Sequence, residues 1–469
     1  MQRKEFDFCV LGAGSAGFAA ATRARELGKS VAFVDGTGPL SGLCILQGCM
    51  PGKTLVHAAD VARTVRNAGS VGIDVSGYTF NVARVVHRKQ CVIDEFAHDR
   101  VQKLEEFPMF RGAPRFVSSH EVTVGDHAIA AKKFLISTGS VINIADIPGL
   151  RETGFLCSDD ILDAQICPKS VIIMGGGAVA AELCQYLFQA GTETTILQRS
   201  AHILSSEDSD IGECLRSVFE RDGIRVVTGV QFQRVESFEG RKRVHAIVDG
   251  EEQSFVADEI LAALGRRANV DNFGFEDAGV EYTRNGVLMN EYLQTSNPDI
   301  YAAGDVTGIW RLLHVAVYEG KLAAQNAFGP EKQPARYDLQ RARVIFSSPQ
   351  VGIVGLSERR AREQGVWYDK ATFPFCELGK AIVMDARDGF VKMLCDKEGK
   401  ILGITYVGAE ASDLIHEAIA LLYFHANIRD VLAIPHIHPT LAEILTAPAE
   451  ELAARTSAEP FQRLGYAWG

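Results

Sequence analysis

The chain alternates short apolar runs with glycine-rich turns, and the first such unit lies near its start. Residues 6–11 form an apolar run, the turn 12–17 follows at once, and an alanine-rich stretch extends to about Gly28. A second apolar run, 30–34, ends at Asp35. Continuous apolar runs bounded by turns are typical of buried parallel strands. We therefore predict a strand, a helix and a second strand in this order.

The same pattern recurs roughly 160 residues later. The apolar run 170–174 leads into a second glycine turn and helix start at 175–182, and the apolar run 194–197 follows. Two such units in one chain are far more specific than either alone. They predict an α/β protein with two Rossmann-like dinucleotide-binding domains. Two domains of this kind suggest two dinucleotides, most economically a flavin and a nicotinamide.

The pattern outside these two units predicts the remaining elements. We expect a helix at 53–68 and then a polar segment of mixed charge to about Glu106, with no long linker anywhere in the chain. Strands that end in small-residue turns are expected at 134–136, 260–264 and 300–303, and Pro148-Gly149 marks a boundary. From about Arg336 the character changes to that of an α+β domain, with strands at 344–346, 352–354, 390–395 and 401–407 and a helix at 411–425.

Composition narrows the class of protein. The 469 residues are 47% hydrophobic and 23% charged, which is ordinary for a globular protein, and the length suggests two to four domains. No apolar run reaches the roughly 20 residues of a membrane helix. The net charge of −11 argues against nucleic acid and anionic membranes as partners. Because Met1 leads almost directly into the first apolar run, without a cleavage site, we expect a cytoplasmic protein.

The first glycine turn carries the dinucleotide fingerprint in its required setting. Glycines between a strand and a helix let the backbone approach a pyrophosphate, which then faces the helix N-terminus. Asp35, at the end of the second strand, is placed to hold a ribose hydroxyl. The candidate pyrophosphate-binding residues of this turn are Gly12, Gly14, Ser15 and Gly17.

The second glycine turn, with candidate residues Gly175 and Gly177, differs from the first where nucleotide specificity is set. The position equivalent to Asp35 is Gln198, and Arg199 follows it. An acid there would repel a ribose 2′-phosphate, whereas an amide followed by a guanidinium accommodates one. The alternative is a solvated arginine at a strand end. The pattern favours NADP(H) over NAD(H).

Cys44 and Cys49 form the only close pair among the ten cysteines. Four residues separate them, glycines lie on both sides, and Lys53 lies four residues past the second thiol. Zinc requires four ligands, and the other cysteines supply no second close pair, so we expect no metal site. The alternative is a pair of small buried residues at a helix start. In a reducing compartment the pair reads better as a reactive dithiol.

Together these motifs resemble the flavin-dependent pyridine nucleotide-disulfide oxidoreductases, the family of dihydrolipoamide dehydrogenase, glutathione reductase and mercuric reductase. The resemblance covers essentially the whole chain. It rests on five ordered features: the turn 12–17, the Cys44/Cys49 motif, the turn 175–182, the Gly304-Asp305 element and the tail from His438 to Glu443. It implies FAD and a nicotinamide nucleotide as cofactors.

The resemblance also implies roles for individual residues. Cys49 corresponds to the cysteine nearer the flavin, and Cys44 to the one that exchanges with a substrate disulfide. His438 matches the family's acid/base histidine, and Glu443 matches the carboxylate that orients it. Further cofactor contacts are expected at the pair Lys53 and Glu182 beside the flavin, and at Thr138, Gly139, Gly265, Gly304 and Asp305.

The same resemblance suggests an assembly and a division into domains. In the family the histidine comes from the opposite subunit, so we expect a homodimer. We expect an FAD-binding domain at 1–150 and 270–335, an NAD(P)-binding domain at 151–269, and an interface domain for dimerisation at 336–469.

Several departures from the family pattern bear on the substrate. Leu43 and Gly52 replace the usual threonine and serine beside the cysteines, and Thr22 stands where glutathione reductases have a substrate-binding arginine. The chain lacks the C-terminal cysteine pair of mercuric reductases. Ala180 and Arg199 resemble the NADP-using branch, whereas the His438 tail resembles the dihydrolipoamide branch.

The leading hypothesis is a disulfide oxidoreductase most like dihydrolipoyl dehydrogenase, acting on lipoamide or on another small or protein-borne disulfide, including that of a lipoyl domain. One alternative is an NADPH-dependent disulfide reductase of the glutathione or mercuric reductase type. A second is a flavin NAD(P)H oxidase or quinone reductase in which the cysteines are auxiliary. A third is a non-catalytic flavoprotein subunit of a larger assembly.

Overall fold

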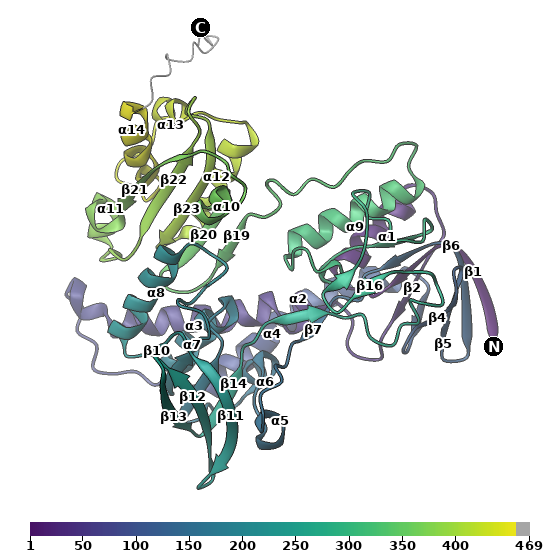
Figure 1. The fold of residues 1–469 in the computed structure, drawn as a ribbon, viewed down its shortest axis with the longest axis horizontal. Coiled ribbons are helices and arrows are strands. Elements are labelled where there is room, and N and C mark those ends of the chain that lie inside the picture. The colour runs from purple at the N-terminus through teal and green to yellow at the C-terminus, as the bar shows by residue number, and fades with distance from the viewer. Residues whose placement is uncertain (456–469) are drawn as a thin grey trace.

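The structure is a computed structural model that describes residues 1–455 (Figure 1). It confirms the α/β class, with two sheets of the dinucleotide-binding type and a separate C-terminal α+β domain. Residues 456–469, which include the tail where the sequence carries no cysteine pair, lie outside the described residues.

The first domain is built on a seven-stranded sheet. Two helices, α1 (Ser15–Glu26) and α9 (Leu313–Phe328), pack against each other beside it. They approach closely because residue 320 is glycine: a Cβ on Gly320 would lie 2.2 Å from the carbonyl O of Ala16. The parallel strands are β3 (Met109–Arg111), β2 (Val31–Asp35), β1 (Gln2–Leu11), β6 (His127–Ile136) and β18 (Ile300–Ala302), and the antiparallel edge is β5 (Glu121–Val124) and β4 (Arg115–Ser118).

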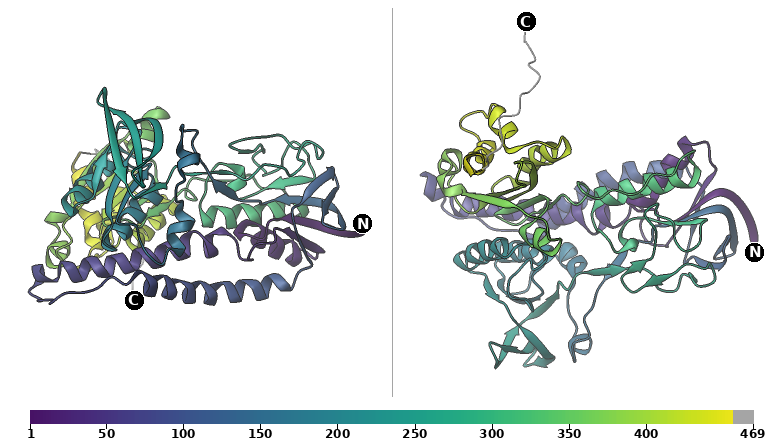
Figure 2. Two further views of the ribbon diagram at one scale, coloured as in Figure 1. Left: turned by 90° about the horizontal axis from the view of Figure 1, so that it is seen from below. Right: turned by 45° about the horizontal axis from the view of Figure 1, so that its top comes forward.

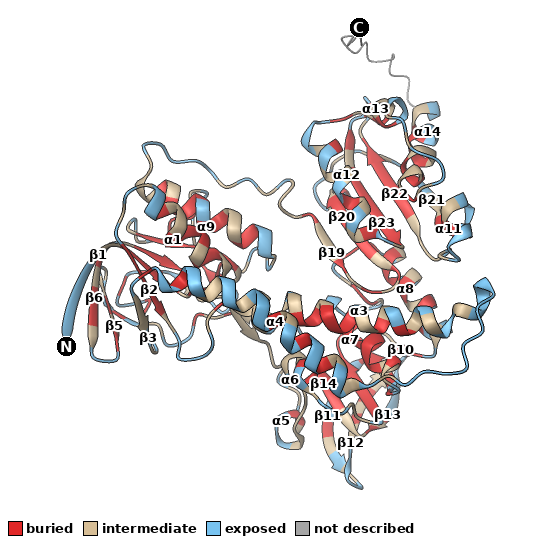
Figure 3. Ribbon diagram, turned by 180° about the vertical axis from the view of Figure 1, so that it is seen from behind, coloured by how far each residue is buried: buried red, intermediate tan, exposed pale blue. Residues whose placement is uncertain are grey.

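Two long helices, α3 (Cys49–Arg66) and α4 (Val82–Glu105), run from the first domain along the second (Figure 2). The short helix α2 (Leu43–Leu46) precedes α3, and the turn η1 (Ala68–Val71) follows it. Helix α4 corrects our expectation of a polar segment up to Glu106. Its buried face carries Val86, Lys89 and Ile93 at helical spacing, while charged residues on its exposed face mask that period (Figure 3).

The second domain has a four-stranded parallel sheet in the order β10-β9-β8-β14. Strand β8 coincides with the predicted run 170–174, whereas the antiparallel sheet β11-β12-β13 was not predicted. The strands are β8 (Ser170–Met174), β9 (Glu193–Leu197), β10 (Arg225–Val227), β11 (Gln231–Phe238), β12 (Arg241–Val248), β13 (Glu251–Ala257) and β14 (Glu259–Ala262), and the helices are α5 (Leu150–Thr153), α6 (Ser158–Asp163), α7 (Ala178–Gln189) and α8 (Ser209–Asp222).

Two further antiparallel pairs are short, and the first lies where the chain passes between these domains. Strand β7 (Ser140–Ile142) leaves the first domain and pairs with β15 (Arg266–Ala268), which returns from the second. The hairpin of β16 (Tyr282–Thr283) and β17 (Gly286–Val287) follows.

The C-terminal domain is a five-stranded antiparallel sheet in the order β19-β20-β23-β22-β21, covered by helices. An extended segment, 329–342, joins it to α9, which corrects our expectation of no long linker (Figure 1). The strands are β19 (Arg343–Ile345), β20 (Gln350–Gly355), β21 (Asp369–Pro374), β22 (Phe390–Cys395) and β23 (Ile401–Gly408), and the helices and 3₁₀ turns are α10 (Glu358–Glu363), η3 (Phe375–Glu377), α11 (Gly379–Val383), α12 (Ala411–Tyr423), α13 (Ile428–Ala433), η4 (Ala442–Leu445) and α14 (Thr446–Arg455).

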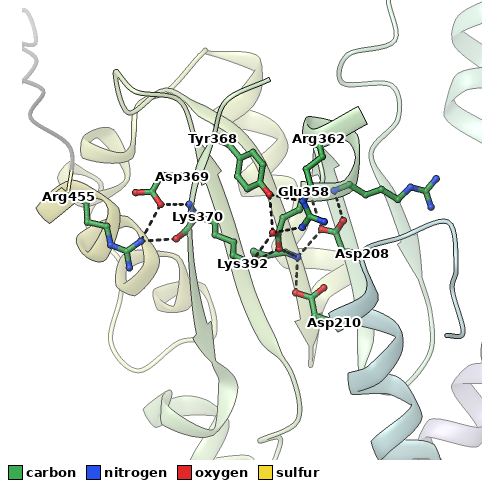
Figure 4. A network of polar contacts seen from close by, with 10 residues as sticks. Asp208, Asp210, Glu358, Arg362, Tyr368, Asp369, Lys370, Lys392 and Arg455 are labelled. Carbon is green, nitrogen blue, oxygen red and sulfur yellow. Dashed lines mark hydrogen bonds and ion pairs between the residues drawn. The ribbon is translucent and has the colours of Figure 1, made fainter. Parts of the chain in front are cut away.

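A buried charge cluster ties the second domain to the C-terminal domain (Figure 4). Lys392 on β22 has a fully buried side chain, and its Nζ lies 2.8 Å from carboxylate oxygens of Asp208 and Asp210 and 3.0 Å from one of Glu358. Asp208 also accepts hydrogen bonds from the backbone N–H groups of Glu358 and Arg359. Three carboxylates and two N–H donors therefore hold the start of α8 against α10 and β22.

Candidate active site

The first glycine turn lies at the carboxyl end of β1, against the end of β6. Gly12 has φ +103°, and a Cβ there would lie 2.3 Å from the carbonyl O of Ser137. Gly17 is equally constrained, because a Cβ would lie 2.0 Å from the Gly12 carbonyl O. Gly14 caps α1, which begins at Ser15. The turn thus leaves the first N–H groups of α1 facing a bare backbone cradle that fits a pyrophosphate.

Asp35 ends β2 beside this turn. Its carboxylate accepts a hydrogen bond from the backbone N–H of Gly36 at 3.0 Å. Burial raises the pKa of Asp35, and the Gly36 N–H and the charge of Arg111 oppose that rise. The half-buried carboxylate therefore lies at the strand end where a ribose hydroxyl is bound in dinucleotide folds.

The dithiol segment packs directly on the first glycine turn. Gly42 has φ +79°, and a Cβ there would lie 2.7 Å from the Cα of Gly14. Cys44 lies in α2, and Cys49 is the first residue of α3. Both are free thiols in this structure, and a hydrogen bond joins them. The structure therefore brings the cysteine pair against the cradle that fits a pyrophosphate.

The two thiols differ in acidity. The hydrogen bond from Cys44 and the charge of Lys53 lower the pKa of Cys49 to about 7, although burial opposes this change. The same hydrogen bond, together with burial, raises the pKa of Cys44. Cys49 also lies at a helix N-terminus, where positive potential stabilises a thiolate. Of the two thiols, Cys49 is therefore the one that ionises first as the pH rises.

Lys53, one helical turn after Cys49, links the two dinucleotide-binding domains. Its Nζ lies 2.6 Å from Oε2 of Glu182 on α7 and 4.6 Å from the ring centre of Phe346. The other carboxylate oxygen of Glu182 accepts the backbone N–H of Phe346 at 3.0 Å. Glu182 is only 8% exposed. A cation is thus fixed beside the dithiol by a nearly buried partner from the second domain.

Thr138 and Gly139 follow β6 and are tied to the chain that returns from the second domain. The Thr138 hydroxyl donates to the carbonyl of Asn269 at 2.7 Å, and the Asn269 N–H donates to the carbonyl of Gly139 at 3.0 Å. Gly265, with φ +88°, accepts the backbone N–H of Asn143 at 3.0 Å. These bonds tie together the two segments through which the chain crosses between the domains.

Asp305 belongs to a three-residue chain of polar contacts, of which sequence analysis found only one member. It begins the 3₁₀ turn η2 (Asp305–Thr307), directly after Gly304 with φ +81°. The hydroxyl of Ser140 donates to Asp305 at 2.6 Å and accepts from Nε of Arg266 at 2.9 Å. Ser140 and Arg266 each directly follow a glycine that we had singled out, and this adjacency was the available signal.

A buried carboxylate behind this turn was also missed. Glu319 on α9 is fully buried, and its two oxygens accept the backbone N–H of Gly304 and the hydroxyl of Tyr337, each at 2.7 Å. Burial raises the pKa of Glu319 to about 7. An acid within an alanine-rich helix carries no sequence sign that its carboxylate points inward. It holds the turn before Asp305 in place.

The second glycine turn repeats the backbone of the first. Gly175 has φ +105°, and a Cβ there would lie 2.5 Å from the carbonyl O of Ala263. Gly177 caps α7 and has open space around it, with no atom within 4 Å of a Cβ. This second cradle likewise fits a pyrophosphate at the N-terminus of α7.

Gln198 and Arg199 end β9 beside this second turn. Gln198 is 8% exposed, and its carbonyl oxygen accepts the backbone N–H of Gly176 at 2.9 Å. Arg199 is exposed and has no hydrogen-bond or ion-pair partner within residues 1–455. The unpaired guanidinium of Arg199 therefore lies next to the Gln198 amide, whose oxygen already accepts a hydrogen bond from the glycine turn.

His438 and Glu443 lie together in the C-terminal domain. Nδ1 of His438 lies 2.9 Å from Oε1 of Glu443, whose other oxygen accepts the Thr440 N–H at 2.7 Å. The Thr440 N–H and then His438 lower the pKa of Glu443. The His438 side chain is 78% exposed. The segment between α13 and α14 lies at the end of its domain away from α2 (Figure 1), so within one chain this segment does not reach the dithiol helices.

Within residues 1–455 no helix is both long enough and apolar enough to cross a membrane. The same residues contain no group of three or more histidine, cysteine, aspartate or glutamate side chains arranged to hold a metal ion.

Comparison with known proteins places these features in a family. Residues 6–320 match the pyridine nucleotide-disulphide oxidoreductase family, and residues 341–449 match its dimerisation domain. The mercuric reductase of Staphylococcus aureus is 33% identical over 451 residues, covering 95% of this chain and 82% of that protein. The dihydrolipoyl dehydrogenase of Bacillus subtilis is 33% identical over 462 residues, covering 94% of this chain and 96% of that protein.

A solved structure shares the fold over nearly the whole length. The HOCl-induced flavoprotein disulfide reductase RclA from Escherichia coli superposes with a TM-score of 0.83 at 24% identity, covering 95% of this chain and 99% of that chain. The dimerisation domain supports a homodimer. This chain belongs to the pyridine nucleotide-disulphide oxidoreductases, and it is an FAD-dependent NAD(P)H oxidoreductase of that family.

Proposed function

We propose that this enzyme is an NADPH-preferring disulfide oxidoreductase that works through a Cys44–Cys49 redox pair, with lipoamide or another small or protein-borne disulfide as substrate. The observation that carries the proposal is the contact of Gly42 with Gly14, which seats the dithiol helices on the first dinucleotide cradle. The relatives named as dihydrolipoyl dehydrogenases and mercuric reductases support a thiol-based reaction.

We place FAD in the first domain and the nicotinamide nucleotide in the second. Asp35 beside the first turn suits the ribose of FAD, and Gly304 and Asp305 lie at a second polar turn of the same domain. Bound FAD would supply the two-electron transfer between the nicotinamide and the cysteine pair. The Lys53 and Glu182 pair lies between the two cradles, so its fixed cation is suited to stabilise negative charge there.

The chain's own residues define the thiol steps. One hydride equivalent cleaves the Cys44–Cys49 disulfide, giving a thiol at Cys44 and a thiolate at Cys49. For exchange, Cys44 loses its proton to the partner's His438 and attacks a substrate disulfide, and the released thiolate takes that proton. Cys49 then attacks Cys44, which restores the disulfide and releases the second substrate thiol after protonation by water. The net reaction consumes NADPH, one proton and one disulfide and yields NADP⁺ and two thiols.

An anaerobic titration with NADPH, and separately with NADH, tests the proposal. The readout is the long-wavelength absorbance that a thiolate gives beside oxidised flavin. We expect this absorbance in the wild type and in Cys44→Ser but not in Cys49→Ser, and we expect it to rise with pH through about 7, because that is the pKa of Cys49. Cys91→Ser, an exposed cysteine on α4, is the matched control.

The outcomes separate the proposal from its alternatives. Quinone or oxygen turnover that survives unchanged in Cys49→Ser would assign the enzyme to the oxidase or quinone reductase type. If the absorbance appears at a lower concentration of NADH than of NADPH, the nucleotide preference is wrong while the dithiol role stands. Turnover with dihydrolipoamide or lipoamide, compared with other disulfides, then ranks the substrates.

A further inference from the structure

A cavity of about 550 Å³ lies outside both glycine cradles, at the crossover between the first two domains. Its wall is formed by the segment after β7, the residues around β15, the β16–β17 turn and the segment after η2. Neither the glycine turns nor the dithiol lines it. Its volume lies in the range of about 300–1,000 Å³ that is typical of small-molecule sites.

The cavity is strongly basic. Five of its lining residues are arginines, and a single aspartate, Asp146, is the only acid among them. These arginines come from four separate parts of the chain: Arg151 from α5, Arg266 and Arg267 from β15, Arg284 from the β16–β17 turn, and Arg311 from the segment after η2.

The arginines differ in whether their guanidinium groups already have ion-pair or hydrogen-bond partners. Arg267 is paired with Asp271 at 2.6 Å, and Arg266 donates to the hydroxyl and carbonyl of Ser140. Among residues 1–455, Arg284 donates only to the side-chain oxygen of Asn143, at 3.3 Å. Arg151 and Arg311 have no hydrogen-bond or ion-pair partner within the described residues.

Three exposed guanidinium groups without a carboxylate partner therefore converge on one cavity. Like charges gathered around a concave surface repel one another. An anion relieves that repulsion, and the planar fork of arginine binds phosphate and carboxylate oxygens in a bidentate manner. A ligand with a single charge would leave most of the cavity's positive charge uncompensated.

We propose that this cavity binds a small polyanion, a molecule that carries at least two phosphate or carboxylate groups, with Arg284 and Arg311 as its principal contacts. The site is separate from the nicotinamide nucleotide site at Gly175 to Arg199. A ligand there would bridge the β16–β17 turn to the segment that follows Asp305. A bound ligand would thus contact the chain next to the polar turn that we assign to FAD.

Calorimetric titration of the FAD-loaded protein tests the site, with inorganic pyrophosphate and citrate as probes, in parallel runs without NADP⁺ and with saturating NADP⁺. We expect one binding site per chain, with affinity that falls as salt is raised. Arg284→Gln and Arg311→Gln should each weaken binding about tenfold, since the loss of one charge-assisted contact costs about 1.5 kcal/mol. Arg115→Gln, an exposed and ion-paired arginine outside the cavity, should not.

The two probes distinguish phosphate from carboxylate chemistry, because one should bind more tightly than the other. Flavin content and circular dichroism of each variant check that the fold is intact. The proposal is overturned if neither probe binds below about 1 mM, if Arg115→Gln weakens binding as much as the cavity variants do, or if NADP⁺ displaces the probes. That last outcome would make the cavity part of the nucleotide site.

Discussion

The two glycine turns of this protein have nearly the same backbone. Gly12 and Gly175 have φ values of +103° and +105°, and at each a Cβ would meet a backbone carbonyl, at 2.3 Å from Ser137 and at 2.5 Å from Ala263. Because the obstruction is backbone, no neighbouring side chain can relieve it. The pyrophosphate cradle is therefore the part of the unit that cannot vary.

The turns differ at the end of the second strand. The half-buried carboxylate of Asp35 lies beside the first turn. Beside the second turn lies the uncharged side chain of Gln198, whose amide oxygen accepts the N–H of Gly176. The free guanidinium of Arg199 follows. In dinucleotide-binding folds the glycine turn binds the pyrophosphate that all dinucleotides share, and the strand end contacts the ribose at which they differ.

The two units also differ in what holds them in the molecule. Helix α1 of the first packs on α9, with Gly320 against Ala16. The second is held to the C-terminal domain by the buried Lys392 and its carboxylates (Figure 4). The first anchor is close packing, whereas the second adds a buried ion cluster to apolar packing that includes Ile345, Val351 and Ile353, so the two domains should respond differently to mutation and to acid.

Removing the buried cation should cause the largest loss of stability, at the junction of the second and C-terminal domains. In Lys392→Met the carboxylates of Asp208 and Glu358, both nearly buried, lose the ammonium that compensates them. Such a loss costs about 3–5 kcal/mol. We expect a lower thermal midpoint than that of the wild type. Hydrogen exchange should increase more in α8 than in α1. Lys370→Met is the control, because Lys370 contacts the same Glu358 with a half-exposed side chain. Equal effects of the two substitutions would contradict an electrostatic anchor.

The second turn offers a matched pair of glycine substitutions. Gly175→Ala forces a Cβ into a carbonyl at positive φ, which should destabilise the protein by about 2–3 kcal/mol. Gly177→Ala meets nothing within 4 Å. It should keep the thermal midpoint and raise the KM for the nicotinamide nucleotide, since the new methyl faces the pyrophosphate. Melting curves and steady-state kinetics separate the two, and unchanged stability of Gly175→Ala would refute the steric argument.

Sequence alone predicted the elements whose hydrophobic pattern is local, above all the buried strands. The apolar run 170–174 is β8, and 390–395 is β22, because a buried strand is apolar along its whole length. Helix α4 was missed because only a few of its residues are buried, and the more numerous charged residues hide their helical spacing. The cluster at Lys392 was out of reach, since it joins residues 184 positions apart and a lysine in a strand signals exposure.

The candidate site divides in the same way. The glycine turns and the cysteine pair have fixed spacing, so sequence located them. The meeting of Lys53 with Glu182 was reached through the family resemblance, and the chain from Arg266 through Ser140 to Asp305 was not foreseen. Contacts that depend on how two domains meet carry no local signal.

Changing the residues at the end of β9 should have a smaller energetic effect, on nucleotide binding. Arg199→Ala should raise the KM for NADPH about tenfold, or about 1.4 kcal/mol, and leave that for NADH nearly unchanged, because only NADPH carries the 2′-phosphate. Gln198→Glu should lower NADPH use further by repulsion. Steady-state kinetics with both nucleotides measure this, and Arg216→Ala, on the exposed face of α8, is the control. An equal loss with NADH would assign Arg199 a structural role.

The smallest effect should appear on acidification, and it should be larger at the buried ion cluster than in the first unit, where the lowered pKa of Asp7 depends on the exposed Lys132. Burial, which raises the pKa of Glu358, is outweighed by hydrogen bonds from Lys370 and Lys392, which lower it to about 2 from an ordinary 4.5. A carboxylate with a depressed pKa in the folded state stabilises that state above its unfolded pKa, and this contribution is lost as the pH falls. The thermal midpoint should therefore decline between about pH 4.5 and pH 2. Glu358→Gln should flatten that decline, whereas Glu363→Gln, an exposed residue on the same helix, should leave it unchanged. If α1 loses protection from hydrogen exchange before α8 over this range, the two anchors do not differ in kind.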